Sequence, residues 1–107
     1  MNRDDSPISV LLIKAYAHKF KANRKQLGLT QEAMVELIQR THSTVTDRTV
    51  KRWEKGETAV PAWALGLQEE LLEHFKDYKN KKHLKSAILE QTSSGFFYSL
   101  KKKLKSN

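Results

Sequence analysis

The hydrophobic residues of this chain recur at helical spacing along most of its length. In the first stretch, large apolar side chains stand at every fourth position and their neighbours widen the stripe: Ile8, Leu11, Leu12, Ile13, Tyr16 and Phe20. Residues spaced by three or four lie on one face of a helix, so the pattern predicts an amphipathic helix with one buried face. Ser6 and Pro7 are typical of a helix start. The predicted helix runs to Gln26, and Gly28 closes it.

Two shorter helices are predicted next. Thr30 is a candidate N-cap, and apolar residues at three-or-four spacing predict a second helix that ends near Gln39. Residues 41–45 are β-branched or prefer caps and turns, which predicts a loop. Thr46 is the candidate N-cap of a third helix, Asp47 to Lys55.

Gly56 ends the third helix, and Pro61 opens a fourth. The fourth helix carries a continuous apolar seam: Ala64, Leu67, Leu71, Phe75 and Tyr78. This seam belongs either to the core alone or to the core and a dimer contact. A fifth helix is indicated by Leu84, Ala87 and Ile88. The sequence therefore predicts an all-α fold, a compact bundle of about five helices, with one domain over residues 1–79 and a basic helical extension over residues 80–107.

The positive charge of the chain is concentrated at its C-terminal end. The 107 residues carry a formal net charge of +8, which favours an anionic partner such as nucleic acid or a membrane surface. Residues 1–75 hold 11 basic and 10 acidic residues, whereas residues 76–107 hold nine and two. Non-specific attraction to phosphates is therefore expected to come mainly from the C-terminal segment.

Several classes of protein are disfavoured by what the sequence lacks. The chain has no Cys, and its four His residues show no ligand spacing, so we expect no metal and no cofactor. It has no glycine-rich phosphate loop and no nucleophile motif, which argues against an enzyme. Without an apolar run long enough to span a membrane or a signal peptide, it is expected to be a soluble, cytoplasmic protein.

The stretch from Lys21 to Leu65 resembles the lambdoid phage repressor and Cro family of helix-turn-helix proteins. The run Arg24-Lys25-Gln26-Leu27-Gly28-Leu29-Thr30-Gln31 is similar to the family's entry into its second helix. The run Trp53-Glu54-Lys55-Gly56, with Pro61 five residues later, is similar to the ending of its third helix. This ending also resembles a smaller branch that includes regulators encoded beside anti-CRISPR genes. The two ends at matching spacing are more specific than either alone.

The resemblance implies that the second and third helices form the helix-turn-helix and that the third lies in the DNA major groove. By position, four residues would contact base edges: Asp47, Arg48, Lys51 and Arg52. Four more would contact phosphates: Thr30, Gln31, Thr49 and Lys55. Val50 and Trp53 would point into the core. Arg24 and Glu54 match an ion pair of the family that ties the first helix to the third.

The chain departs from the family pattern at two places. The spacing from Thr30 to Trp53 is longer than usual, and the surplus lies between the second and third helices. Either the second helix is longer or residues 41–45 loop out. The loop after the third helix, commonly basic in relatives, begins here with Glu57 and carries no basic residue before Pro61.

These features favour a sequence-specific regulator, most simply a homodimeric repressor that reads an inverted repeat in double-stranded DNA. An alternative is the DNA-binding antitoxin of a toxin–antitoxin pair, with the C-terminal segment bound to a protein partner. Residues 96–105 mix aromatic and leucine residues with lysines. Three alternatives are open: they dock on the protein or on a partner subunit with lysines near phosphates, they lie on a membrane, or they are disordered. We favour the first of these and expect no membrane partner.

Overall fold

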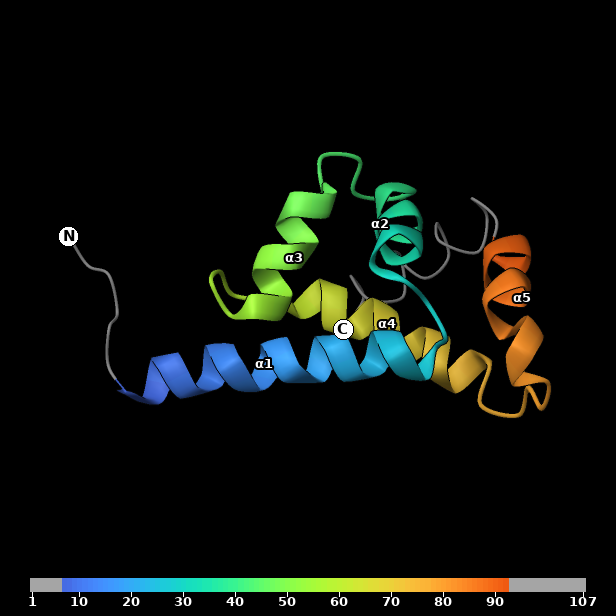
Figure 1. The fold of residues 1–107 in the computed structure, drawn as a ribbon, viewed down its shortest axis with the longest axis horizontal. Helices are drawn as coiled ribbons and strands as arrows, with labels where there is room; N and C mark the ends of the chain where they lie inside the picture. The colour runs from blue at the N-terminus through green and yellow to red at the C-terminus, as the bar shows by residue number, and fades with distance from the viewer. Residues whose placement is uncertain (1–6, 93–107) are drawn as a thin grey trace.

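Five α-helices and one 3-10 turn make up the described part of the chain (Figure 1). The computed structural model describes the backbone of residues 7–92 and the side chains of residues 9–92. In order, the elements are α1 (Pro7–Gln26), α2 (Gln31–Gln39), α3 (Asp47–Lys55), α4 (Ala62–His74), η1 (Lys81–His83) and α5 (Leu84–Gln91). The predicted all-α bundle of about five helices is confirmed. The division at residue 79 and the fold of residues 93–107 stay predictions, the latter lying outside the described residues.

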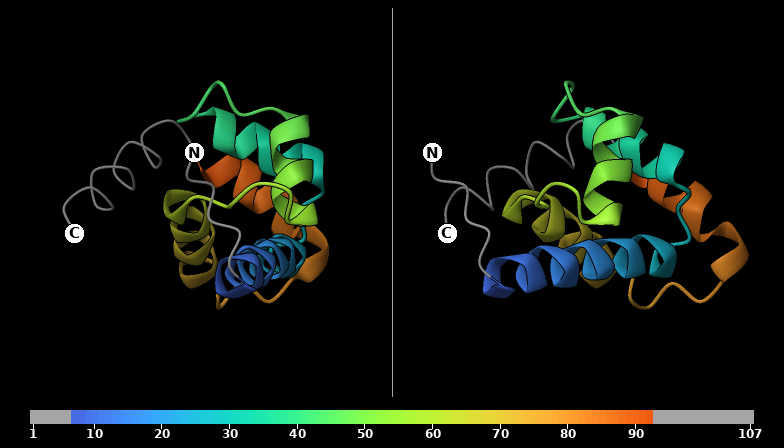
Figure 2. Two further views of the ribbon diagram at one scale, coloured as in Figure 1. Left: turned by 90° about the vertical axis from the view of Figure 1, so that its left-hand side faces the viewer. Right: turned by 60° about the vertical axis from the view of Figure 1, so that its left-hand side comes forward.

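Helix α1 is the base on which the other helices are arranged. Helix α3 stands over it, α2 lies beside α3, and α4 runs along another flank of α1 (Figures 1 and 2). The η1 turn and α5 lie at the end of the molecule opposite to the start of α1 (Figure 1). No helix within residues 7–92 is long and apolar enough to cross a membrane.

Local signals in the sequence fix most of the helix ends. The Thr30 hydroxyl accepts a hydrogen bond from the backbone N–H of Ala33 at 3.1 Å and so caps α2. Thr46 caps α3 in the same way. Gly28 and Gly56 follow α1 and α3 with φ values of 73° and 74°, a left-handed conformation that glycine adopts without a steric penalty. The bounds predicted for these three helices are confirmed.

Helix α4 is shorter than its apolar seam predicts. It ends at His74, and the chain continues through three-residue turns in which Lys76 N–H bonds Glu73 and Tyr78 N–H bonds Phe75. Phe75 is still buried and Tyr78 still packs against the core. Spacing alone could not locate the end of α4, because apolar residues continue at helical spacing through the turns that follow the helix.

One core joins all five helices. It contains Phe20 from α1, Met34, Leu37 and Ile38 from α2, Val50 and Trp53 from α3, Leu67 and Leu71 from α4, and Leu84, Ala87 and Ile88 from α5. The apolar seam of α4 is therefore used within the molecule. Because α5 contributes to the same cluster, its burial stabilises the bundle as well as the helix itself.

A buried glutamine links α1 and α4 inside this core. Gln68 has no exposed surface, and its amide nitrogen donates to the Phe20 carbonyl at 2.9 Å. Its amide oxygen accepts from the Asn23 side chain at 3.2 Å. At the surface, the Lys19 ammonium lies 2.8 Å from the Glu69 carboxylate, and this hydrogen bond raises the pKa of Lys19. These contacts fix where α4 crosses α1.

The apolar face predicted along the whole of α1 is buried only in its second half. Phe20 is fully buried, but Val10, Leu11, Leu12 and Tyr16 are 42%, 67%, 48% and 44% exposed. The prediction fails there because α4 lies along the second half of α1 and does not reach its earlier turns (Figure 1).

Helix α5 is attached to the end of α2 through Arg40. The Arg40 guanidinium donates to the backbone carbonyl of Thr92, to the Thr92 hydroxyl at 3.0 Å and to the Leu89 carbonyl at 3.3 Å. The last carbonyls of a helix have no partner within the helix, and a cation there also interacts favourably with the helix dipole. Arg40 thus caps α5 and holds the chain at Thr92 beside α2.

We expect Gln68→Leu to lower the free energy of unfolding by about 1–3 kcal/mol, although it makes the core more apolar. The substitution leaves the buried Asn23 amide without its acceptor. Chemical denaturation followed by circular dichroism measures the effect. The matched control is Gln91→Leu at an exposed position of α5, which should change stability by less than about 0.5 kcal/mol. A stabilised Gln68→Leu variant would contradict this account.

Candidate nucleic-acid interface

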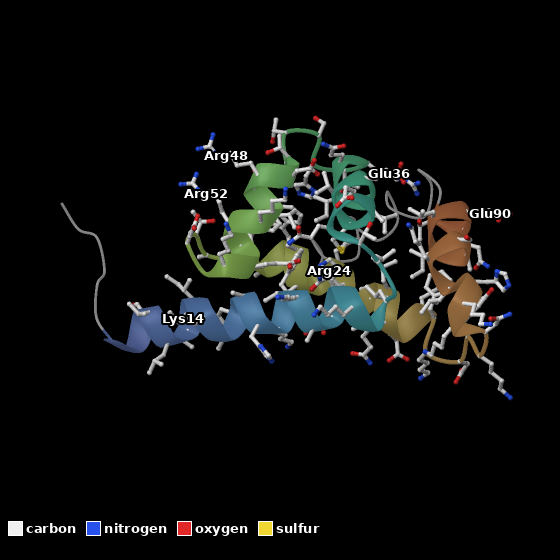
Figure 3. The ribbon with its side chains drawn as sticks, viewed as in Figure 1. Lys14, Arg24, Glu36, Arg48, Arg52 and Glu90 are labelled. Atoms are coloured by element: carbon white, nitrogen blue, oxygen red, sulfur yellow. The ribbon has the colours of Figure 1, made fainter. Side chains whose placement is uncertain are left out.

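Helix α3 has one buried and one exposed face. Val50 and Trp53 point into the core, with 0% and 5% of their surface exposed. The residues that the family resemblance assigns to base edges are all exposed: Asp47, Arg48, Lys51 and Arg52. Arg48 and Arg52 are one turn apart and project from the same side of α3, away from the body of the protein (Figure 3). The exposed face therefore presents guanidinium groups to solvent on a firmly packed helix.

The N-terminus of α3 is closed by two threonines. The hydroxyls of Thr46 and Thr49 lie 3.1 Å apart, and each also bonds a backbone N–H of the other residue. This capping box occupies the Thr49 hydroxyl, for which a phosphate contact is predicted. Thr30 has a comparable role at α2, but its hydroxyl accepts only, so the proton of that group can still be donated.

The Glu54 carboxylate joins three helices. Arg24 of α1 donates to it from Nε at 2.7 Å and from Nη2 at 3.0 Å, so the expected ion pair is present and bidentate. Gln31 of α2 donates to the same carboxylate at 3.0 Å. The remaining Arg24 contact is from Nη1 to the Leu29 carbonyl at 2.9 Å. With side-chain exposures of 10% for Arg24 and 3% for Glu54, the pair is largely shielded from water.

This arrangement changes the expectation for Gln31. Its side-chain amide is turned towards Glu54, which sequence reasoning did not predict. One of its two N–H groups is used there, so a phosphate contact would need the other. The motif gave no signal for this bond because Gln31 and Glu54 are 23 positions apart.

The surplus residues between α2 and α3 loop out and are held in place. Helix α2 ends at Gln39, whose side-chain amide donates to the Val45 carbonyl at 2.8 Å. Val45 is buried, and the His42 ring stacks on Trp63 with ring centres 3.6 Å apart. Trp63 is half-buried and packs against the core with this imidazole on one face. Of the two alternatives left by the sequence, the loop is the one observed.

Lys14 of α1 is a basic residue that sequence reasoning missed. Its Cγ atom lies 3.5 Å from the position that a Cβ atom would take at Gly56, where α3 ends. The Lys14 residue is exposed and lies at the same end of the molecule as Arg48 and Arg52 (Figure 3). It precedes the stretch that resembles the family. Lys55, in the last turn of α3, is also exposed.

Besides Asp47, a second carboxylate lies close to this basic surface. The Glu57 carboxylate is 3.6 Å from Arg52 Nε, and both side chains are about half exposed. Such an exposed pair is weak and exchanges readily with water, so Arg52 is positioned rather than neutralised by it. Among residues 7–92 there is no cluster of His, Cys, Asp or Glu that could hold a metal ion. The local chemistry is that of cationic hydrogen-bond donors.

Comparison with protein-family models, curated proteins and solved structures gives no match to this chain. The resemblance to the repressor and Cro family therefore stays a prediction.

We expect Glu54→Ala to lower the free energy of unfolding by about 3–5 kcal/mol, because it leaves the buried Arg24 guanidinium without its carboxylate. Urea denaturation followed by circular dichroism measures the loss. Glu57→Ala is the matched control, since its carboxylate also pairs with an arginine but is half exposed, and it should cost less than about 1 kcal/mol. Equal losses for the two variants would contradict the role assigned to Glu54.

Proposed function

We propose that this protein is a sequence-specific, non-catalytic DNA-binding regulator that reads an inverted repeat as a homodimer, most simply as a repressor. The observation that carries the proposal is the division of α3, where Val50 and Trp53 anchor one face and Arg48, Lys51 and Arg52 occupy the other. A helix of this kind fits the major groove, whose base edges distinguish all four base pairs.

Within this proposal, the two arginines of α3 read bases. A guanidinium can donate two parallel hydrogen bonds to O6 and N7 of guanine, and each such pair discriminates by about 1–3 kcal/mol. Asp47 can only accept, so it favours a cytosine amino group or orients a neighbouring arginine. An acidic group at this end of α3 supports selective recognition over purely electrostatic attraction.

The buried contacts behind α3 support its use as a reading element. Glu54 and Trp53 fix the helix to α1 and α2, so its exposed side chains start from a rigid backbone. Lys14, Thr30 and Lys55 lie in exposed positions around α3 and α2, where they could contact phosphates. Phosphate contacts set orientation and register, whereas base contacts set sequence preference.

Selection of bound sequences from a random pool of double-stranded DNA tests the proposal. We expect the full chain to enrich a palindromic motif, and we expect Arg52→Ala to relax the preference at one position of each half-site by roughly 10–100-fold. Lys14→Ala should instead weaken binding to all sequences similarly. Lys85→Ala, at an exposed position of α5, is the control that should change neither. Binding without any enriched motif, and only at low salt, would contradict sequence specificity.

Deletion of residues 96–107 separates non-specific attraction to DNA phosphates from recognition of the DNA sequence. The segment contains four lysines, so its removal should reduce the slope of log affinity against log salt while leaving the enriched motif unchanged. Fluorescence anisotropy with the selected DNA at several salt concentrations measures the slope. A changed motif would mean that this segment contacts bases or sets the spacing of half-sites.

A further inference from the structure

A small cavity lies where the ends of α1 and α4 meet η1 and the start of α5. Its volume is about 130 Å3, and it is found at the end of the molecule opposite to the start of α1 (Figure 1). Protein interiors are close-packed and contain few voids larger than a water molecule. This cavity is large enough for a small ligand, since an apolar cavity of roughly 150 Å3 accommodates a benzene ring.

The inner wall of the cavity is apolar and belongs to the core. Leu27, Phe75 and Leu84 line it and have 1%, 5% and 3% of their surface exposed. Leu72 completes this wall, is half-buried and packs against the core. The core cluster that joins the helices holds these side chains in place. The wall is therefore preformed, and an apolar group can lie against it without rearrangement of the bundle.

The outer wall of the cavity is polar and cationic. Gln26, Lys76 and Lys81 line it and are exposed. The Lys76 ammonium lies 2.6 Å from the Glu73 carboxylate, so its charge is largely balanced. Within residues 9–92, the Lys81 ammonium makes no ion pair. Because an ammonium and a glutamine amide both donate hydrogen bonds, this wall offers one unbalanced positive charge with further donors beside it.

The surroundings of the cavity favour an anion. Residues 73–85 contain five lysines and two carboxylates. Free carbonyls at the C-terminal end of a helix are negative and would repel an anion. At the end of α1, however, the carbonyls of residues 23–25 accept backbone hydrogen bonds from residues 27–29, and turns close the end of α4 in a similar way. The lysines therefore dominate the field at the mouth of the cavity.

We propose that this cavity binds a small monocarboxylate, with its apolar body against the inner wall and its carboxylate paired with Lys81. An apolar wall with a few polar groups at its edge is the usual form of a small-molecule site. The single unbalanced ammonium matches a single negative charge, whereas a phosphate monoester carries up to about two. The volume admits one six-membered ring or a branched chain of similar size, and it excludes a nucleotide.

Titration of the full-length protein with benzoate, followed through its backbone amide NMR signals, tests the proposal. Amides of residues 26–29, 72–76 and 81–84 should shift together along one saturating curve, with a dissociation constant of about one millimolar for a ligand of this size. Benzamide, which has the same ring without the charge, should bind at least about fivefold more weakly. Inorganic phosphate, which has no apolar body, should not shift these amides at the same concentration. Shifts that do not saturate, or equal binding of benzamide, would overturn the proposal.

Two lysine variants separate this site from general attraction to the basic turn. Lys81→Ala should weaken benzoate binding by about three- to tenfold, because it removes a charged hydrogen-bond donor. Lys82→Ala is the matched control, since Lys82 is the next residue of η1, is equally exposed and does not line the cavity. Lys81→Arg, which keeps the charge, should retain most of the affinity. Equal losses for the two alanine variants would overturn the proposal.

A cavity-filling variant tests the apolar part of the site. Leu72→Trp places a larger side chain at a half-buried position of the wall and should abolish benzoate binding while the circular dichroism spectrum keeps its helical form. Unchanged benzoate affinity in this variant would overturn the proposal. The inference does not rest on the proposed function, because the cavity has no lining residue from α3 among the residues that the structure describes. Benzoate binding by a protein that selects no DNA motif would contradict the proposed function alone.

Discussion

The structure depends above all on one shielded carboxylate. Glu54 sits in α3 and accepts hydrogen bonds from Arg24 of α1 and Gln31 of α2, so it fixes three helices that the core alone would leave free to shift. Shape-matched apolar packing tolerates small displacements, whereas a bidentate guanidinium–carboxylate contact has one geometry. Burial strengthens this constraint, because water could not solvate either charge if the contact were broken. The exposed side chains of α3 therefore project from a backbone whose position is fixed.

The remaining polar contacts fix the positions of α4, of α5 and of the loop between α2 and α3. Gln68 fixes α4 against α1, and Arg40 fixes the end of α5 against the end of α2. The loop between α2 and α3 would otherwise be the least restrained part of the candidate site, since it is longer than the family pattern. The stack of His42 on Trp63 and the bond from Gln39 to Val45 hold it against the bundle instead. The loop contacts before α3 and the Glu54 contacts near its end therefore hold this helix at both ends.

The sequence was most informative where structure is determined locally. A capping threonine or a glycine at positive φ acts within a few residues, so the ends of α1, α2 and α3 could be predicted from Thr30, Thr46, Gly28 and Gly56. Periodicity shows that a helix face is apolar but not what covers it, which is why the exposure of Leu12 and Tyr16 was missed. The Arg24–Glu54 pair was predicted only through the family resemblance. The Gln31–Glu54 bond and the place of Lys14 beside Gly56 follow from the crossing of helices, which no local pattern encodes.

The two halves of α1 have different surroundings within one long helix. Its second half belongs to the core and carries Arg24, through which it positions α3. Its first half extends past α4 and exposes apolar surface that the core does not need. Among the side chains of α1 that the structure describes, Ala17 is the first that is buried. The turns before Ala17 are largely apolar, and Lys14 among them lies beside Gly56 at the end of α3. One long helix thus contacts α3 at two places, through the Arg24–Glu54 pair in its second half and through Lys14 beside Gly56 in its first.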